Sequence, residues 1–471
     1  MPVTETTMKG WNVILRLVAT CALVAPMLSV AQHRGADEEF TMALTGDSII
    51  TRKLSVYEEP EYLQMIELLR SADMAFTNLE MLFHDYEPYP MAVSGGTWMR
   101  ADPALADDLV WAGFDMVSRA NNHTGDYGRL GMELTTKYVA DTGIVQAGVG
   151  LSLAEAREAK FLETAQARVA LISISSSFAR HMGAGRSRDD VPARPGLNPL
   201  RYKTTYVIPD TDFEQLRQTG ESLDQFTDMD GFPRGTDEEE PGKMEVFGRN
   251  FAIGDEPVIR MEANEDDVQE ITAVVNNASR VADFTVVTIH AHEHAGRREL
   301  SPEFLHVFAR AMIEAGADVF VTHGPHILRG IEIYQGKPIF YSMGNFIFQN
   351  ETLLRLPSDN YERYDLDGNA HVADFNDARY ENDTEGFPTL AENWESIIAV
   401  PTFRGGNLAE LQLYPINLAY GAPRQVRGRP LFAERELAEK IIGDLQRLSK
   451  PYGTEIEFRR GIGIVKLTDA D

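Results

Sequence analysis

The sequence predicts an α/β fold from three observations. Short apolar runs rich in β-branched residues alternate with segments of helical periodicity along most of the chain. The chain has 471 residues, of which 43% are hydrophobic, so it is long enough to bury a large core. Polar and ionisable residues directly follow several apolar runs, as they do at the ligand-binding edge of open α/β sheets. Strands alternating with helices in this way indicate an α/β architecture.

The first half of the chain alternates regularly. Strands are expected at 40–45, 74–78, 114–118, 145–147 and 167–173, and helices at 62–69, 103–112, 131–142 and 152–158. The alternation stops over 175–251, where Gly, Pro and acidic residues occur without a sustained apolar period. This segment is interpreted as an insertion over one edge of the domain.

The second half resumes the pattern. A helix is expected at 265–278, a strand at 284–289, a helix at 302–315 and β-rich runs at 319–321, 330–334 and 338–341. A second irregular, acidic segment covers 350–394, and strands at 396–402 and 408–416, a helix at 434–449 and a strand at 462–465 follow it. The sequence therefore predicts one domain over 40–467 with insertions at about 175–251 and 350–394.

Residues 1–31 differ from the rest of the chain. Lys9 and Arg16 flank or interrupt the start of an apolar run, 17–30, which is too short to span a bilayer and ends in the small-x-small pattern at 29–31. This predicts a signal peptide and a periplasmic or secreted protein; an uncleaved anchor formed by 9–31 is the alternative. Cys21, the only cysteine, lies in this segment, so cleavage would leave no thiolate ligand and no disulfide.

The formal net charge is −28, from 44 basic and 72 acidic side chains. Such a surface argues against binding to nucleic acid or to anionic lipid, so membrane contact is expected only through an uncleaved N-terminal segment. The charge is uneven, because 210–245 and 351–395 each hold 12 acidic and 3 basic residues. The remaining scaffold is only mildly acidic.

The residues that can carry chemistry share one position, the end of an expected strand or the turn after it. They are Asp47, Glu80, Asn122, His123, His290, His323 and His326. The carboxyl ends of strands in an open α/β sheet lie together, so these side chains could converge. Carboxylate, amide and imidazole ligands without thiolate suit one or two divalent ions such as Mn, Fe or Zn.

Each of these residues also has a simpler explanation. Asp47 could cap a helix, Glu80 could be a surface loop residue, and Asn121 and Asn122 could serve only to form a turn. Three histidines alternate over 290–294, and an extended backbone would point them the same way, yet only one or two would reach a metal. The metal site is predicted from the set, since no single residue establishes it.

In this order, the residues resemble those of the CapA-type capsule synthesis proteins, also described as poly-γ-glutamate synthesis proteins, of the calcineurin-like metallophosphoesterase superfamily. The matching segments are 46–47, 78–80, 120–124, 126–128, 290, 323–326 and 341–346, and the resemblance covers roughly 41–465. The resemblance implies a four-layer α/β/β/α sandwich of the metallophosphoesterase type, with the site on one edge.

The resemblance also implies roles. Asp47 would be the first carboxylate ligand, and Glu80 the bridging carboxylate in place of the usual Asp. Asn122 would bind metal through its side-chain oxygen, and His123 beside it would be the general acid or an oxyanion stabiliser. The set is completed by the ligands His290, His323 and His326, and by the further pocket candidates Asn121, Asp126, Arg119 and Asn345.

Two departures from the family pattern affect the number of ions. Ordinary metallophosphoesterases carry a histidine two residues after the first aspartate, where this chain has Ile49. The histidine of the fourth motif is commonly followed by an aromatic residue and a glycine, where this chain has Ala291 and His292. His292 either replaces the missing ligand or lines the pocket. The number of bound ions, one or two, therefore stays open.

The resemblance implies a metal-dependent hydrolase-like protein of the cell envelope, acting in synthesis, modification or export of a capsular polymer such as poly-γ-glutamate, as part of a synthesis or export complex. Two alternatives stay open: a non-catalytic accessory protein that retains the fold, and a phosphoesterase acting on a small molecule or lipid head group. A polyanion would be repelled by the net charge unless a local basic patch intervened. Four arginines lie beside the motifs and could form such a patch, or they could be ordinary solvated side chains: Arg119, Arg297, Arg298 and Arg329.

Overall fold

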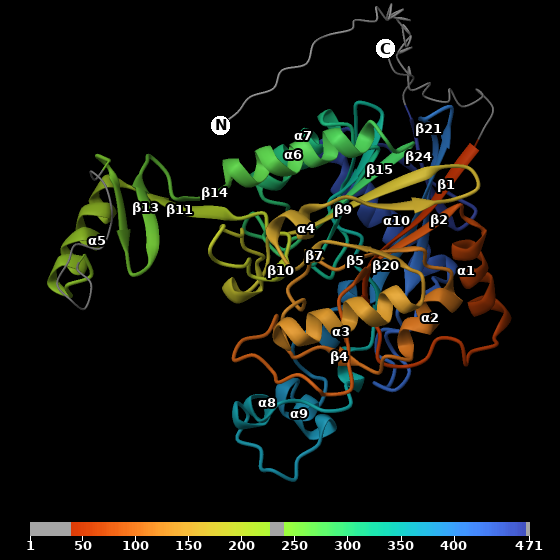
Figure 1. Ribbon diagram of the computed structural model, residues 1–471, viewed down its shortest axis with the longest axis horizontal. Helices are drawn as coiled ribbons and strands as arrows, with labels where there is room; N and C mark the ends of the chain where they lie inside the picture. Colours follow the sequence, from red (N-terminus) through yellow and green to blue (C-terminus); the bar gives the residue numbers. More distant parts are fainter. Residues whose placement is uncertain (1–38, 227–239, 468–471) are drawn as a thin grey trace, which may run out of the picture.

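The computed structural model describes residues 39–226 and 240–467, so the expected signal peptide at 1–31 lies outside the described residues. Two large sheets form the body, helices lie on either side of them, and a smaller lobe projects from one end (Figure 1). The expected α/β class is confirmed. Among the described residues, no helix has both the length and the apolar character needed to cross a bilayer.

The larger sheet has the strand order β23-β24-β21-β20-β1-β2-β5-β6, with β19 pairing β1 and β22 pairing β21. Its strands are β1 (Glu39–Ile49), β2 (Met74–Leu79), β5 (Met116–Ser118), β6 (Val145–Ala147), β19 (Asn345–Phe348), β20 (Glu395–Arg404), β21 (Asn407–Asn417), β22 (Leu431–Phe432), β23 (Ile456–Arg459) and β24 (Ile462–Val465).

The smaller sheet has the order β17-β18-β16-β15-β9-β8. Its strands are β8 (Lys160–Glu163), β9 (Arg168–Ser175), β15 (Phe284–His290), β16 (Val319–His323), β17 (Ile331–Tyr334) and β18 (Lys337–Phe340). Two short pairs also form, β3 (Leu82–Phe83) with β4 (Arg100–Ala101) and β7 (Val149–Gly150) with β10 (Gly196–Leu197).

The central strands are buried on both faces. In β1, Met42 and Leu44 join the core shared with the smaller sheet, whereas Ala43 faces the helices on the other side. In β16, Val321 joins the same shared core and Phe320 points away from it. This period-two alternation of apolar residues on both faces explains why the expected strands are continuous apolar runs.

The helices cover the outer faces of the two sheets (Figure 1). The outer face of the larger sheet packs against α1 (Pro60–Ser71), α2 (Leu105–Ala112) and α3 (Gly128–Asp141), and that of the smaller sheet against α6 (Glu265–Ser279) and α7 (Glu303–Glu314). The remaining helices of the body are α4 (Leu153–Arg157) and α10 (Arg435–Ser449), and α10 contributes to the core between the sheets.

Residues 202–226 and 240–263 form a lobe with a sheet of its own, ordered β12-β13-β11-β14. It contains β11 (Tyr202–Ile208), α5 (Asp210–Ser222), β12 (Lys243–Val246), β13 (Arg249–Ile253) and β14 (Val258–Ala263). The sequence showed no strand period here because residues on both faces of β13 and β14 are exposed or half-buried. Residues 196–200 are buried in the body, so the lobe begins later than the irregular stretch does.

The second acidic segment also contains regular structure, namely α8 (Ser358–Glu362) and α9 (Val372–Arg379). Its charges are partly neutralised by the body: Arg427 forms a buried ion pair with Glu351, and Arg424 pairs with Asp377 (2.6 Å) and Asp383 (2.5 Å). The second acidic segment is therefore attached to the body by arginines that are distant from it in the sequence, and only part of its charge is solvated.

Candidate metal centre

Two sheets contribute to one cluster of ionisable side chains. Asp47 lies in β1 and Glu80 directly after β2, whereas His290 and His323 are the last residues of β15 and β16 and lie opposite each other in the register. All four side chains are fully buried. The expected convergence of strand ends is observed, with the difference that Asp47 lies within its strand. The strand continues to Ile49 because β19 pairs with it there.

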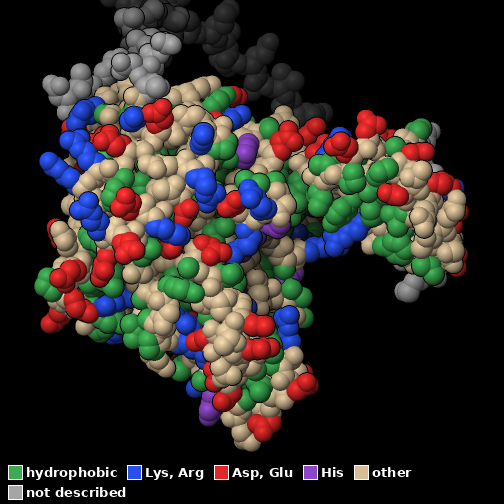
Figure 2. Space-filling view, turned by 180° about the vertical axis from the view of Figure 1, so that it is seen from behind, with side chains coloured by type: hydrophobic (Ala, Val, Ile, Leu, Met, Phe, Trp, Pro, Cys, Tyr) green, Lys and Arg blue, Asp and Glu red, His purple; other side chains and the backbone are tan. Residues whose placement is uncertain are grey.

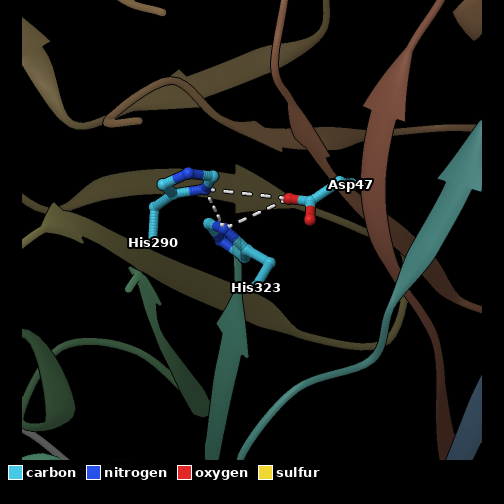
Figure 3. Close-up of side chains that lie close together, drawn as sticks. All are labelled: Asp47, His290 and His323. Atoms are coloured by element: carbon cyan, nitrogen blue, oxygen red, sulfur yellow. Dashed lines mark hydrogen bonds and ion pairs between the residues drawn. The ribbon is translucent and has the colours of Figure 1, made fainter. Parts of the chain in front are cut away.

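The first group of ligand atoms surrounds Asp47. Its Oδ1 lies 3.7 Å from Nδ1 of His290 and 3.6 Å from Nδ1 of His323, and the two nitrogens are 3.0 Å apart (Figure 3). Figure 3 shows both rings and the carboxylate pointing toward a common point from three strands. These three side chains could hold one metal ion.

The second group surrounds Glu80. Its Oε1 lies 3.8 Å from Nε2 of His290 and 4.0 Å from Nε2 of His326, and Nε2 of His292 lies 3.0 Å from Nε2 of His290. Glu80 could therefore share an ion with His290 and His292, or with Asp47 and His326. His290 presents Nδ1 to the first group and Nε2 to the second, and His292 joins the cluster on the Glu80 side.

The chemistry of these residues fits a divalent cation. Both carboxylate oxygens of Glu80 are buried and lack a hydrogen-bond partner within the described residues. Burial raises the pKa of Glu80 well above its ordinary value and that of Asp47 to about 7. Burial lowers the pKa of His323 to about 3 and that of His326 to about 4. A bound cation would compensate the buried carboxylates and use the neutral imidazoles as ligands.

The turn after β16 is held by a hydrogen bond from its backbone to the carboxylate of Asp47. Gly324 has a φ of +114° and donates its N–H to Asp47 Oδ2 at 3.0 Å. His326 has a φ of +59°, in the left-handed region that costs a residue other than glycine about 1–3 kcal/mol. Its Nδ1 lies 2.8 Å from Oδ1 of Asn345, which orients the ring. This strained conformation places His326 within 4.0 Å of Glu80.

A tight contact also fixes Asp47 itself. A Cβ on Gly46 would lie 1.9 Å from the carbonyl oxygen of Gly344, and that same oxygen accepts the N–H of Asp47 at 3.0 Å. Only glycine allows two backbone segments to approach this closely. The Gly-Asp pair seen in the sequence is therefore a packing requirement as well as a candidate ligand.

His123 and Asp126 form a hydrogen-bonded pair beside Glu80. Nδ1 of His123 lies 2.7 Å from Asp126 Oδ2, and its Nε2 lies 3.7 Å from Glu80 Oε1. Asp126 also accepts the N–H groups of Gly95 at 3.0 Å and Met99 at 2.8 Å, so its carboxylate is held in place. The imidazole of His123 is thereby oriented with its second nitrogen toward the cluster.

The two asparagines before His123 have different contacts. Oδ1 of Asn121 accepts the N–H of His123 at 3.1 Å, and its Nδ2 donates to the carbonyl oxygen of Leu79 at 2.8 Å. Asn122 donates Nδ2 to the carbonyl oxygen of Gly95 at 3.1 Å, and its Oδ1 is buried without a hydrogen-bond partner in the described residues. Asn121 holds the turn together, and the ligand role of Asn122 stays a prediction.

The arginines near the motifs are unequally placed. Arg119 and Arg329 are each 1% exposed, so neither contributes to a basic surface patch. Arg119 donates to Gln146 at 2.7 Å, and burial lowers its pKa to about 9. Arg329 donates to the carbonyl oxygens of Arg298 at 2.8 Å and Glu293 at 2.9 Å, and Arg297 pairs with Glu299 at 3.0 Å.

The structure adds three residues to the site for which the sequence predicted no role. Asn78 donates Nδ2 to Asp47 Oδ1 at 2.7 Å, while Thr288 Oγ1 lies 2.7 Å and Ser118 Oγ 3.3 Å from Nε2 of His323. Such contacts orient ligand side chains. Asn78 belongs to the matching segment 78–80, but it was not among the predicted site residues. Thr288 and Ser118 gave no signal, because buried hydroxyls are common within strands.

The metal-free protein should become more stable as the pH rises from about 4 to 6.5. His323 and His326 have lowered pKa values, so they bind fewer protons folded than unfolded over this range, and the free energy of unfolding rises with pH. The raised pKa values of Asp47 and Glu80 act in the opposite direction. The free energy of unfolding should still rise with pH, because four histidines with lowered pKa values, including His290 and His292, outnumber the two carboxyl groups with raised pKa values.

Urea unfolding in the presence of a chelator would measure this slope. His326→Asn is the matched variant, because asparagine tolerates the left-handed backbone conformation. It should reduce the slope by up to about 1.4 kcal/mol per pH unit, the value for one proton. A wild-type stability that falls with pH between 4 and 6.5 would contradict the expectation.

Comparisons with known proteins identify the family of the chain. The family described as Bacterial capsule synthesis protein PGA_cap matches residues 41–350, more than half of the chain. Two proteins of Sinorhizobium fredii (strain NBRC 101917 / NGR234), Uncharacterized protein y4sH and Uncharacterized protein y4uA, are each 38% identical over 442 residues, covering 91% of this chain and 93% of theirs. Capsule biosynthesis protein CapA of Bacillus anthracis is 22% identical over 342 residues, covering 71% of this chain and 66% of that protein. The resemblance inferred from the motifs is confirmed, and the chain belongs to the bacterial capsule synthesis family.

Proposed function

We propose that this protein is a metal-dependent hydrolase of the cell envelope that acts on a capsular polymer such as poly-γ-glutamate during its synthesis, modification or export. One observation carries the proposal: the buried carboxylate of Glu80, which lacks a hydrogen-bond partner within the described residues, lies among histidines whose pKa values are lowered. Titratable groups perturbed in this way cluster at functional sites. Family membership supports the envelope setting and the polymer.

The finer fold assignment is part of the proposal. The shared core between the two sheets, with α1–α3 outside one sheet and α6 and α7 outside the other, is compatible with the α/β/β/α sandwich of metallophosphoesterases. The cluster lies where β1 and β2 of one sheet meet β15 and β16 of the other. This position supports the assignment, because α/β enzymes bind ligands at strand ends.

The ligand assignment follows from the two groups described above. One ion would be held by Asp47, His290 and His323. The side chains of Glu80, His292 and His326 would either hold a second ion or add ligands to a site for a single ion. A divalent cation bound there supplies Lewis-acid polarisation of a substrate oxygen.

The role of His123 follows from its hydrogen bond to Asp126. The carboxylate accepts the Nδ1 proton and fixes the tautomer. A proton held at Nε2 faces the Glu80 side of the cluster, so it can be delivered to a leaving group there. Because the same ring can take a proton back from water, the pair can serve both halves of a hydrolysis.

The test is elemental analysis of the purified protein, combined with assays on poly-γ-glutamate, a phosphodiester and a phosphomonoester in added manganese, iron or zinc. One or two ions per chain and cleavage of the polymer are expected. Turnover of phosphoesters alone would instead identify a phosphoesterase acting on another substrate. Protein that binds no ion and cleaves none of the three would be an accessory protein of a synthesis or export complex.

A further inference from the structure

A cavity lies at the base of the lobe, and one of its lining residues, Ser176, is hydrogen-bonded to the backbone of His290. Its volume is about 920 Å³, and most of its wall is formed by residues between 176 and 202. Four arginines line it, Arg180, Arg186, Arg194 and Arg201, and none of the lining residues is acidic. Figure 2 shows Lys and Arg side chains gathered where the lobe meets the body. A basic cavity is unusual in a chain with a net charge of −28, and it would attract an anion locally.

The four arginines are not equally neutralised. Arg201 pairs with Asp267 at 2.7 Å and Arg186 pairs with Glu270, and both of these acids lie on α6. Within the described residues, neither Arg180 nor Arg194 has a carboxylate partner; Arg194 donates Nε to the carbonyl oxygen of Gly183 at 2.8 Å. Two guanidinium groups on the cavity wall are thus available to an anionic ligand.

The cavity wall is connected to the metal centre on two sides. Ser176 lines the cavity, and its N–H donates to the carbonyl oxygen of His290 at 3.0 Å. Ser177, next along the chain, accepts the N–H of His292 at 2.7 Å. On the other side, Nε2 of His181 lies 3.3 Å from the carbonyl oxygen of Gly125, in the turn that follows His123. A ligand in the cavity therefore lies beside the segments that carry His290, His292 and His123.

Size and charge narrow the class of ligand. A cavity of about 920 Å³ is larger than a single small anion requires and can hold several units of a chain. Each available guanidinium forms a planar fork that matches one carboxylate in bidentate fashion. A polyphosphate as long as such a chain would carry more negative charge than two guanidinium groups can neutralise. The acidic surface of the protein would repel the excess charge. The half-buried rings of Phe178 and Tyr202 can contact the apolar part of a chain.

We propose that this cavity binds a chain of carboxylate-bearing units, with Arg180 and Arg194 each binding one carboxylate, and that it directs the adjoining unit of the chain toward the metal centre. One part of this inference, that the bound chain is directed toward the metal centre, rests on the proposed function. The cavity adds a binding site made of residues outside the metal cluster, and its binding step can be measured separately from hydrolysis.

The test is calorimetric binding of a glutamate hexamer to the metal-loaded protein, in a His123→Ala background so that the probe is not consumed. A glutamine hexamer and inorganic tripolyphosphate serve as comparison probes. The glutamate hexamer should bind, the glutamine hexamer should not, and tripolyphosphate should bind more weakly. Arg180→Ala and Arg194→Ala should each weaken binding several-fold, and the double variant by at least tenfold.

Arg188→Ala is the matched control, because Arg188 lies in the same segment, pairs with Asp190 at 3.0 Å and does not line the cavity. It should bind like the parent protein. Arg194→Ala also removes a backbone contact, so Arg180→Glu, which breaks no hydrogen bond among the described residues, tests the charge without that change. It should abolish binding with an unchanged unfolding transition.

Unchanged affinity in the double variant, an equal loss in Arg188→Ala, or tighter binding of tripolyphosphate than of the glutamate hexamer would each overturn the inference. Polymer hydrolysis without arginine-dependent binding would contradict this inference and leave the proposed function intact. Arginine-dependent binding in a protein that hydrolyses nothing would support the inference and contradict the proposed function.

Discussion

His123→Ala should lower kcat on the polymer by about 10³-fold while the metal content of the protein stays unchanged, since positioned acid–base groups contribute about 10²–10⁴-fold. The imidazole is hydrogen-bonded to Asp126 at 2.7 Å, and its second nitrogen lies 3.7 Å from Glu80 Oε1. It is outside the three groups of side chains that could hold an ion, so its loss should spare metal binding. Elemental analysis and steady-state kinetics on the same preparation measure both quantities.

His294→Ala is the matched control, because this exposed histidine follows His292 by two residues and belongs to none of the candidate metal groups. It should leave both quantities unchanged. Asp126→Asn should lower kcat less than His123→Ala does, because it disturbs the orientation of the ring and leaves the ring in place. If Asp126 acts only through His123, the double variant should be no slower than His123→Ala alone. A fall in metal content with His123→Ala would instead make this histidine a ligand.

The strand ends were predictable because they combine two strong local signals. The central strands are buried on both faces, so their sequences are continuous apolar runs, and Asp47, Glu80 and His290 break those runs abruptly. At Glu80 and His290 this break marks both the end of the strand and the position of the chemistry, whereas β1 continues past Asp47 to Ile49. The register that places His290 opposite His323 could not be read from the sequence, because it depends on how β15 and β16 pair.

The strands of the lobe, within the segment expected to be an insertion, were missed for the opposite reason. In β13 and β14 most side chains are exposed or half-buried on both faces, so neither strand has the apolar alternation that marks a strand. The same stretch of sequence concealed the arginine cavity. Arg180, Arg194 and Arg201 are spaced irregularly along the segment between β9 and β11, and only the path of the backbone through this segment brings them to one wall. Side chains that meet through tertiary folding without a local period give no signal in a single sequence.

Glu80→Gln should have opposite effects on stability in metal-free and metal-loaded protein. In metal-free protein, the substitution removes a buried carboxylate that has no hydrogen-bond partner among the described residues, so the free energy of unfolding at neutral pH should rise by about 1 kcal/mol. With metal, the wild type gains about 2.7 kcal/mol when the free ion is at 100 times its Kd. The variant should lose most of that gain, because an amide is a weaker ligand than a carboxylate.

Chemical unfolding with chelator and with increasing manganese measures both effects, and the stability curves of the two proteins should cross. Glu332→Gln is the matched control, because Glu332 is equally a buried glutamate but is bound by Arg310 at 2.8 Å and Tyr341 at 2.6 Å. It should be destabilised by the same amount with and without metal, since the substitution weakens the bonds from Arg310 and Tyr341 whether or not metal is bound. If Glu80→Gln behaved like Glu332→Gln, the carboxylate of Glu80 would have a structural role and the metal assignment would fail.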